Sequence, residues 1–179
     1  STGPVTGSQQ VGGIVGAMEN STLRYVWNTG TVAGSQKVGG IVGEADGGSI
    51  RHAVWKTGSA GQAVGALSNG ADVTTDVKVA PEADMKKAAT YTDWKDANGN
   101  AVVATEGGVG TPWRIYEGHT TPLLTGLMKG TKCLAKVYDG KTFGDGDAHI
   151  ISDTPLEKNV GTYDARGIYS DAFGYDLIG

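Results

Sequence analysis

The chain has 179 residues, with 15 Lys and Arg against 19 Asp and Glu, and no basic cluster, which argues against a nucleic-acid partner. Glycine supplies 30 residues without the three-residue period of collagen, so the excess indicates many tight turns. A single cysteine, Cys133, excludes an intrachain disulfide, and no apolar run is long enough to span a membrane. Because the chain begins at Ser1 without a signal peptide, we expect a monomeric fragment of a longer precursor.

Two copies of one repeat occupy residues 5–30 and 32–58. The first contains VGGIVG and then LRYVWNTG, and the second contains VGGIVG and then IRHAVWKTG. Equivalent residues are 27 positions apart, as in the pairs Val5 and Val32, Val11 and Val38, and Leu23 and Ile50. The closing Thr-Gly pair recurs after 28 positions, so the second copy carries one inserted residue. A third, shortened copy begins near residue 61, keeps Val64-Gly65 and ends in a predicted strand at 72–79.

Within each copy the pattern is typical of short strands. Leu23, Tyr25 and Trp27 alternate with their neighbours at a period of two, and VGGIVG is a short apolar run bounded by turn residues. At about 3.3 Å per strand residue, one repeat can trace a closed turn of a β-solenoid, with successive turns about 4.8 Å apart. We therefore predict that residues of the first VGGIVG lie beside their counterparts in the second: Val11, Ile14 or Val15 beside Val38, Ile41 or Val42.

These strings carry a family resemblance. VGGIVG, LRYVWNTG at 23–30, VAGS and the second VGGIVG resemble the GLUG repeat. That repeat occurs in large bacterial surface proteins, including filamentous-haemagglutinin-like adhesins and some surface-anchored immunoglobulin A proteases. The resemblance implies a β-solenoid over residues 1–80 and a secreted or cell-surface location.

Residues 81–128 have a different composition. Pro81-Glu82 and the stretch to Ala89 predict a short helix, with proline near its first position and acidic residues in its first turn. Residues 97–100 predict a turn, and 113–116 a short strand. The order of large apolar residues resembles the segment that closes a GLUG array: Met85, Trp94, Trp113, Ile115, Leu123 and Leu124. The resemblance implies a cap over the exposed end of the repeats, near Val64, Leu67 and Val73.

Residues 129–179 resemble a second module of the same kind of protein. The string KVYDG at 136–140, with IYSD at 168–171 and GYD at 174–176, is similar to the YDG module of haemagglutinin-type adhesins. The resemblance implies a small β-module that acts as a stalk or spacer. Together with the repeats, it implies a Gram-negative adhesin exported by two-partner secretion.

Candidates for chemistry are few. Asp139, Asp145 and Asp147 are weak calcium candidates, because carboxylates two positions apart around a glycine can share a hard cation. The loop lacks EF-hand spacing, and aspartates in a glycine turn are ordinary turn formers. The three histidines lack ligand spacing, and Cys133 has no recognisable nucleophile context. We therefore expect no metal, no cofactor and no catalysis.

Two further features are candidates for surface contact. Trp27 and Trp55 lie at matching ends of the two copies and could stack on a sugar ring if both faced solvent, although core packing is the simpler interpretation. The inserted residue could turn Trp55 to the opposite side. Asn20-Ser21-Thr22 is the only N-x-S/T sequon, and the resemblance to high-molecular-weight adhesins makes Asn20 a candidate glycosylation site.

The sequence thus predicts an all-β fold in three parts: a short β-solenoid of glycine-rich 27-residue repeats (1–80), a capping segment with one short helix (81–128), and a small YDG-like β-module (129–179). We expect a structural and adhesive segment of a large bacterial surface adhesin, without catalysis or membrane insertion. Its expected partner is a host or bacterial surface receptor, with glycans among the candidates. The alternatives are a carbohydrate-binding module, or an accessory repeat region of a surface-anchored peptidase.

Overall fold

A computed structural model describes residues 1–133, 150–152, 168–170 and 174–178. The chain consists of two compact units, Ser1–Met85 and Lys86–Gly179, which are called the repeat unit and the second unit below. The described residues form an all-β fold with a single short α-helix, α1 (Glu82–Met85). No helix in these residues is long and apolar enough to cross a membrane. The three-part division expected from the sequence remains a prediction.

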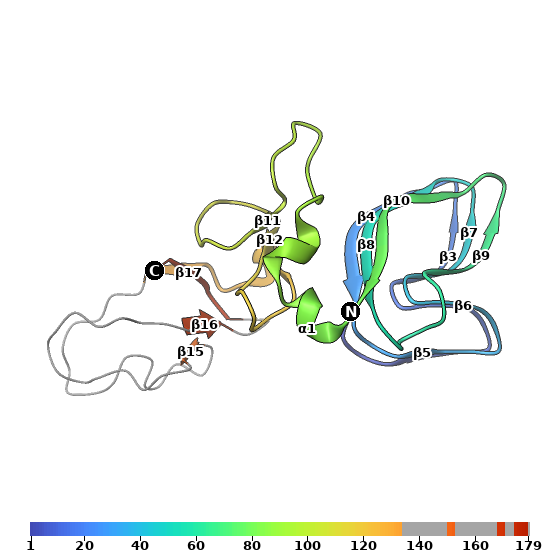
Figure 1. The fold of residues 1–179 in the computed structure, drawn as a ribbon, viewed down its shortest axis with the longest axis horizontal. Coiled ribbons are helices and arrows are strands. Elements are labelled where there is room, and N and C mark those ends of the chain that lie inside the picture. Colours follow the sequence, from blue (N-terminus) through green and yellow to red (C-terminus); the bar gives the residue numbers. More distant parts are fainter. Residues whose placement is uncertain (134–149, 153–167, 171–173, 179) are drawn as a thin grey trace, which may run out of the picture. The chain divides into compact units, whose positions relative to one another are not determined.

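The repeat unit contains ten strands that recur in the same order (Figure 1). The first repeat contributes β1 (Val5–Thr6), β2 (Gln9–Gly12), β3 (Val15–Glu19) and β4 (Thr22–Asn28). The second contributes β5 (Val32–Ala33), β6 (Gln36–Gly39), β7 (Val42–Asp46) and β8 (Ser49–Lys56). The shortened third repeat keeps β9 (Val64–Ser68) and β10 (Asp72–Ala80), which matches the strand predicted at 72–79.

All strand pairs of the repeat unit are parallel and join equivalent segments of successive repeats. The sheets are β1-β5, β2-β6, β3-β7-β9 and β4-β8-β10. Val11 pairs with Val38, Val15 with Val42, and Leu23 with Ile50, so the 27-residue register is confirmed. The third repeat is shorter but continues the same pairing, with Val64 beside Val42 and Val77 beside Ala53.

The insertion in the second repeat leaves the paired strands intact. Pairing at the 27-residue offset continues to Asn28 and Trp55, the last pair of β4 and β8. Beyond that point the offset has changed, because Thr31 accepts a hydrogen bond from Val5 whereas Ser59 accepts the equivalent bond from Val32. The extra residue is therefore accommodated in the turn that follows β8.

The strands bend at stacked residues in the left-handed backbone region. Tyr25, His52 and Asp76 occupy equivalent places in β4, β8 and β10 and have φ of 57°, 53° and 49°. Gln10 and Lys37 form a second such pair, at 53° and 51°. This conformation is unfavourable for residues other than glycine, so its recurrence at equivalent positions marks a corner built into each repeat.

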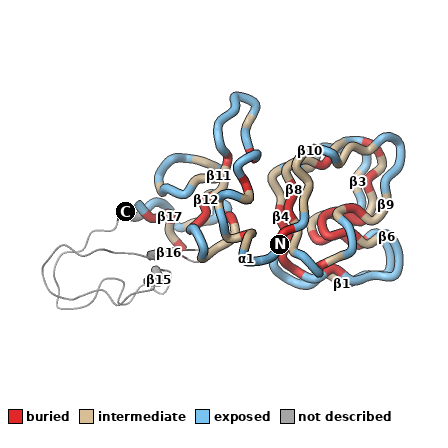
Figure 2. Tube along the Cα trace, viewed as in Figure 1, coloured by how far each residue is buried: buried red, intermediate tan, exposed pale blue. Residues whose placement is uncertain are grey.

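The core of the repeat unit lies between the sheets and is densest in the second repeat (Figure 2). Ile41, Val42, Ala45, Ile50 and Ala53 are at most 1% exposed. Their counterparts in the first repeat, which have a neighbouring repeat on one side, are only partly buried: Ile14, Val15, Met18, Leu23 and Val26. Burial therefore comes from stacking on both sides, as expected for repeats that cannot bury their apolar face alone.

The second unit is built from shorter elements. The described part of it contains two 3-10 helices, η1 (Ala88–Tyr91) and η2 (Thr125–Leu127). It also contains β11 (Val103–Ala104), β12 (Trp113–Arg114), β13 (Leu123–Leu124), β14 (Thr131–Cys133), β15 (Ile150–Ser152), β16 (Ile168–Ser170) and β17 (Asp176–Ile178). Parallel pairs join β11 to β12 and β14 to β17, and antiparallel pairs join β12 to β13 and β15 to β16.

Two local predictions for this region need correction. The helix expected to continue to Ala89 ends at Met85, because Lys87 adopts an extended conformation before η1 begins. The strand expected over 113–116 is limited to Trp113–Arg114. The turn predicted at 97–100 is present, with the Asp96 carboxylate accepting hydrogen bonds from the backbone of Asn98 and Asn100.

Aromatic residues pack together in the second unit. The rings of Tyr91 and Trp94 meet edge to face at 4.8 Å, and those of Trp94 and Trp113 at 6.3 Å. Trp94 and Ile115 are fully buried. The expectation that this segment covers the end of the repeats remains a prediction, although Leu67, one of the residues to be covered, is 50% exposed.

Candidate functional site

The candidate calcium ligands Asp139, Asp145 and Asp147 lie outside the described residues, as does His149. Within the part of the chain that the structure describes, no group of three or more His, Cys, Asp or Glu residues could hold a metal ion. Cys133 is the last residue of β14, where its backbone pairs with Ile178.

The two candidate tryptophans do not share a surface. In the register of β4 and β8, Trp27 pairs with Val54 whereas Trp55 pairs with Asn28. Successive residues of a strand point to opposite faces, so the two rings lie on opposite sides of the sheet. Trp27 is only 8% exposed, and Trp55 packs against Gly40 and the buried core. A sugar could not stack on both rings in this arrangement.

Asn20 lies in the exposed turn between β3 and β4, with φ of 44°. Its backbone N–H donates a hydrogen bond to Asp46 of the next repeat at 2.8 Å, which holds the turn in place. The sequon is therefore on the surface, and glycosylation at Asn20 stays a prediction.

The outer corner of the repeat unit carries a column of stacked polar side chains. The rings of Tyr25 and His52 are parallel, with centroids 5.1 Å apart. Nδ1 of His52 lies 3.3 Å from the Asp76 carboxylate, which also forms an ion pair with Lys78 at 2.8 Å. Because the three repeats stack in register, one side chain from each repeat enters the column.

A second column follows the corner at Gln10 and Lys37. Both side chains donate hydrogen bonds to the Glu44 carboxylate, with Lys37 Nζ at 2.6 Å. These hydrogen bonds hold the pKa of Glu44 below its usual value, and the bond from Lys37 has the largest effect. The stacked repeats thus carry two organised sets of polar side chains.

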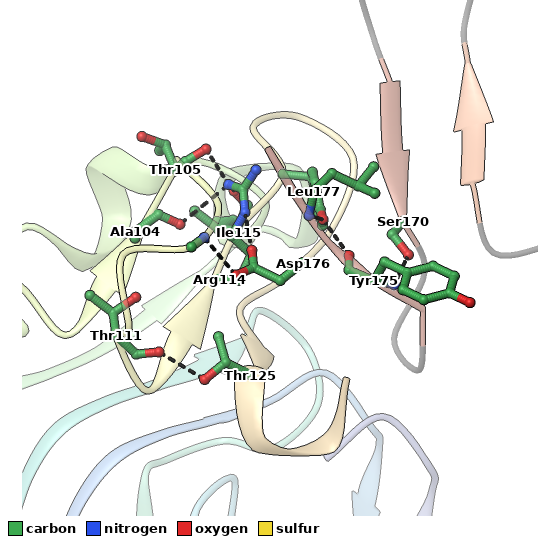
Figure 3. A network of polar contacts seen from close by, with 12 residues as sticks. Ala104, Thr105, Thr111, Arg114, Ile115, Thr125, Ser170, Tyr175, Asp176 and Leu177 are labelled. Carbon is green, nitrogen blue, oxygen red and sulfur yellow. Dashed lines mark hydrogen bonds and ion pairs between the residues drawn. The ribbon is translucent and has the colours of Figure 1, made fainter. Parts of the chain in front are cut away.

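A buried polar network in the second unit forms a different kind of arrangement (Figure 3). Arg114, on β12, is 6% exposed, and Asp176, on β17, is 8% exposed. Arg114 Nε lies 3.2 Å from Asp176 Oδ1, and Arg114 Nη1 donates hydrogen bonds to the carbonyl oxygens of Thr105 and Ile115. The second carboxylate oxygen of Asp176 accepts a hydrogen bond from the Gly108 N–H at 2.8 Å.

Tyr116 completes this network. Its ring lies 4.1 Å from the Arg114 guanidinium carbon, a cation–π arrangement. Its hydroxyl donates to the Tyr175 carbonyl at 2.6 Å and accepts from the Leu177 N–H at 3.0 Å. The pKa of the Tyr116 phenol is raised, and burial of the phenol is the largest cause. The network therefore fixes β17 against β12 across more than sixty residues of sequence.

The Arg114–Asp176 pair borders a hollow of about 180 Å³. The hollow is lined by a glycine-rich loop, by three threonines and by the ion pair: Glu106, Gly108, Val109, Gly110, Thr111, Arg114, Thr125, Gly130, Thr131 and Asp176. Thr125 Oγ1 donates to the carbonyl oxygens of Thr111 and Pro112. The wall therefore combines one guanidinium, two carboxylates and several hydroxyl groups.

No pattern in the amino-acid sequence marks this site. Arg114 and Asp176 belong to no motif, and their separation in the chain gives no spacing signal. The one available hint is an arginine placed between the large apolar residues Trp113 and Ile115, where a charge needs a buried partner.

In the comparisons with known proteins, no family model, no curated protein and no solved structure matches the chain.

Proposed function

We propose that the chain is a structural and adhesive segment of a large bacterial surface adhesin, in which the 27-residue repeats form a short β-solenoid. The GLUG-like and YDG-like strings of the sequence support this assignment. In this proposal the chain is secreted to the cell surface and acts by scaffolding and surface contact, without catalysis.

The observation that carries the proposal is the parallel, in-register pairing of equivalent strands in successive repeats. Val11 beside Val38 and Val15 beside Val42 are the pairs expected when each repeat makes one turn and stacks on the next. A stack of this kind can lengthen by adding repeats without changing the contacts inside it, which suits a stalk or spacer.

Two sets of polar side chains along the stack are candidates for contact. Tyr25, His52 and Asp76 stack on one another at one corner, and Gln10 and Lys37 hold Glu44 at another. In this proposal a receptor meets the exposed parts of these partly charged sets. The specificity for a receptor then comes from complementary charges on the two surfaces more than from burial of a receptor side chain in a pocket.

The experiment is surface labelling of intact cells of the bacterium that produces the chain. Antibodies raised against the purified chain should bind intact cells, and brief treatment of those cells with an external protease should remove the signal. Antibodies against a cytoplasmic protein serve as the control for cell integrity. Labelling that appears only after lysis would contradict a surface location.

A further inference from the structure

We propose that the hollow beside Arg114 and Asp176 binds a single sugar ring through its hydroxyl groups. This inference rests on the adhesin assignment for its biological meaning, but the site belongs to the second unit alone. It places sugar recognition away from Trp27 and Trp55, which lie in the repeat unit.

The hollow is rigidly built. Arg114 donates from Nη1 to backbone carbonyl oxygens, rests on the Tyr116 ring and faces Asp176 through Nε. Asp176 is held in turn by the Gly108 N–H. The Arg114 side chain is more than nine-tenths buried and has many contacts, so it has little conformational freedom. Binding of a ligand therefore costs little additional side-chain entropy.

A glycine-rich loop forms one wall of the hollow. A Cβ on Gly107 would lie 2.0 Å from the Leu177 carbonyl oxygen, so a larger residue there would push the loop away from β17. Gly108 and Gly110 both have φ of 74°, a conformation that disfavours other residues. The loop therefore brings its backbone close to the ion pair and leaves the space above it open.

The wall of the hollow has unused hydrogen-bonding capacity. Arg114 Nη1 donates to several carbonyl oxygens, whereas among the described residues no carbonyl or carboxylate oxygen accepts a hydrogen bond from Nη2, on the Tyr116 side of the guanidinium. Within the same part of the chain, the exposed Glu106 carboxylate has no hydrogen-bond or ion-pair partner. The hollow thus offers a donor and an acceptor at once, which is what a sugar hydroxyl requires, since it accepts from one group and donates to the other.

Charge and size narrow the ligand class. Glu106 and Asp176 against Arg114 leave a net negative wall, which disfavours phosphate, sulfate and carboxylate ligands. A hollow of about 180 Å³ is smaller than the roughly 300–1,000 Å³ of sites for drug-sized ligands, so it fits one small ring. Val109, 53% exposed at the loop, supplies an apolar surface for the C–H face of such a ring. A neutral, polyhydroxylated ring meets all three conditions.

The test is ligand-observed saturation-transfer NMR on the full chain, with glucose, galactose, mannose, N-acetylglucosamine and fucose as probes, followed by titration of any that bind. We expect at least one probe to bind with a Kd near or below about 1 mM. Glu106→Ala should weaken that binding about tenfold or more. Glu19→Ala, which removes an exposed glutamate from the repeat unit, should leave it unchanged.

Melting curves of both variants verify folding, and because Glu106 is exposed with no partner in the described residues, its loss should not lower the melting temperature. Absence of binding by all five sugars would overturn the proposal. Equal binding by wild type and Glu106→Ala would also overturn it, because the ligand would then occupy another surface. Neither outcome affects the surface-labelling result, so failure of this site and failure of the adhesin assignment are distinguishable.

Discussion

Gly43, in β7, provides the sharpest test of close stacking between repeats. A Cβ built on Gly43 would lie 2.3 Å from the Gln10 carbonyl carbon, 2.4 Å from the Gly16 oxygen and 2.5 Å from the Val11 nitrogen. Ordinary van der Waals contacts lie at 3.4–4 Å, so the first repeat would have to move by about 1 Å. All three atoms belong to the backbone, and no side-chain rotation can relieve the overlap.

We therefore expect Gly43→Ala to destabilise the repeat unit by about 3 kcal/mol, the upper end of the usual cost of overpacking. That is a large share of the roughly 5–15 kcal/mol that stabilises a typical domain. The matched control is Gly61→Ala, where an added Cβ would meet nothing within 4 Å. The change at Gly61 should be close to neutral.

The assay is urea unfolding followed by tryptophan fluorescence, with the free energy of unfolding taken from the midpoint and slope. If Gly43→Ala and Gly61→Ala had the same stability within about 0.5 kcal/mol, the repeats could not approach as closely as the parallel register requires.

Three other predictions concern single groups. Tyr116→Phe removes the hydroxyl that accepts a hydrogen bond from the buried Leu177 N–H. The free energy of unfolding, measured by chemical denaturation, should fall by about 1–3 kcal/mol. Unchanged stability would argue against the network. The pKa of Glu44 is lowered in the folded state, so its carboxylate stabilises the fold above pH 4.5, the usual pKa, and this contribution is lost as the pH falls through the lower folded-state pKa. In that acid range the urea midpoint of Glu44→Gln should therefore decline less steeply with falling pH than that of wild type. Parallel pH profiles of the two proteins would exclude the effect. EDTA should leave the melting temperature unchanged, and a calcium-dependent rise that Asp145→Ala abolishes would show that a site had been missed.

The pairing of the repeats could be predicted because it follows from self-similarity. Val11 and Val38 occupy equivalent positions, and equivalent residues of stacked repeats must share an environment. The offset of 27 residues therefore gave the register directly. The position of Trp55 beside Asn28, and not beside Trp27, also follows once the inserted residue is placed after the strand.

The role of the glycines was harder to predict. Composition assigns them to turns, yet Gly43 and Gly65 lie inside strands, where an added Cβ would meet the backbone of a neighbouring repeat. Composition does not reveal a close approach between backbones, because the approaching segment lies more than twenty residues away in the sequence. A glycine inside a predicted strand is the clue that indicates such an approach.

The second unit was less predictable because its contacts are not periodic. The extended conformation of Lys87 interrupts a stretch with good helix-forming residues, since tertiary contacts override local propensity. The Arg114–Asp176 pair joins two short strands far apart in the sequence, and no spacing identifies Asp176 as the partner of Arg114. Only the folded chain places these charges together.

The central claim is that equivalent strands of successive repeats lie side by side, and a disulfide cross-link tests it most directly. Ser49 Oγ lies 3.5 Å from Thr22 Oγ1, and these two residues are a register pair of β8 and β4. In a Cys133→Ser background, Thr22→Cys with Ser49→Cys should form a disulfide readily under mild oxidation, because the bond needs Cβ atoms about 3.5–4.5 Å apart. Thr22→Cys with Arg51→Cys, which is out of register, should not. Equal cross-linking of the two pairs, or none in either, would contradict the stacked-repeat account.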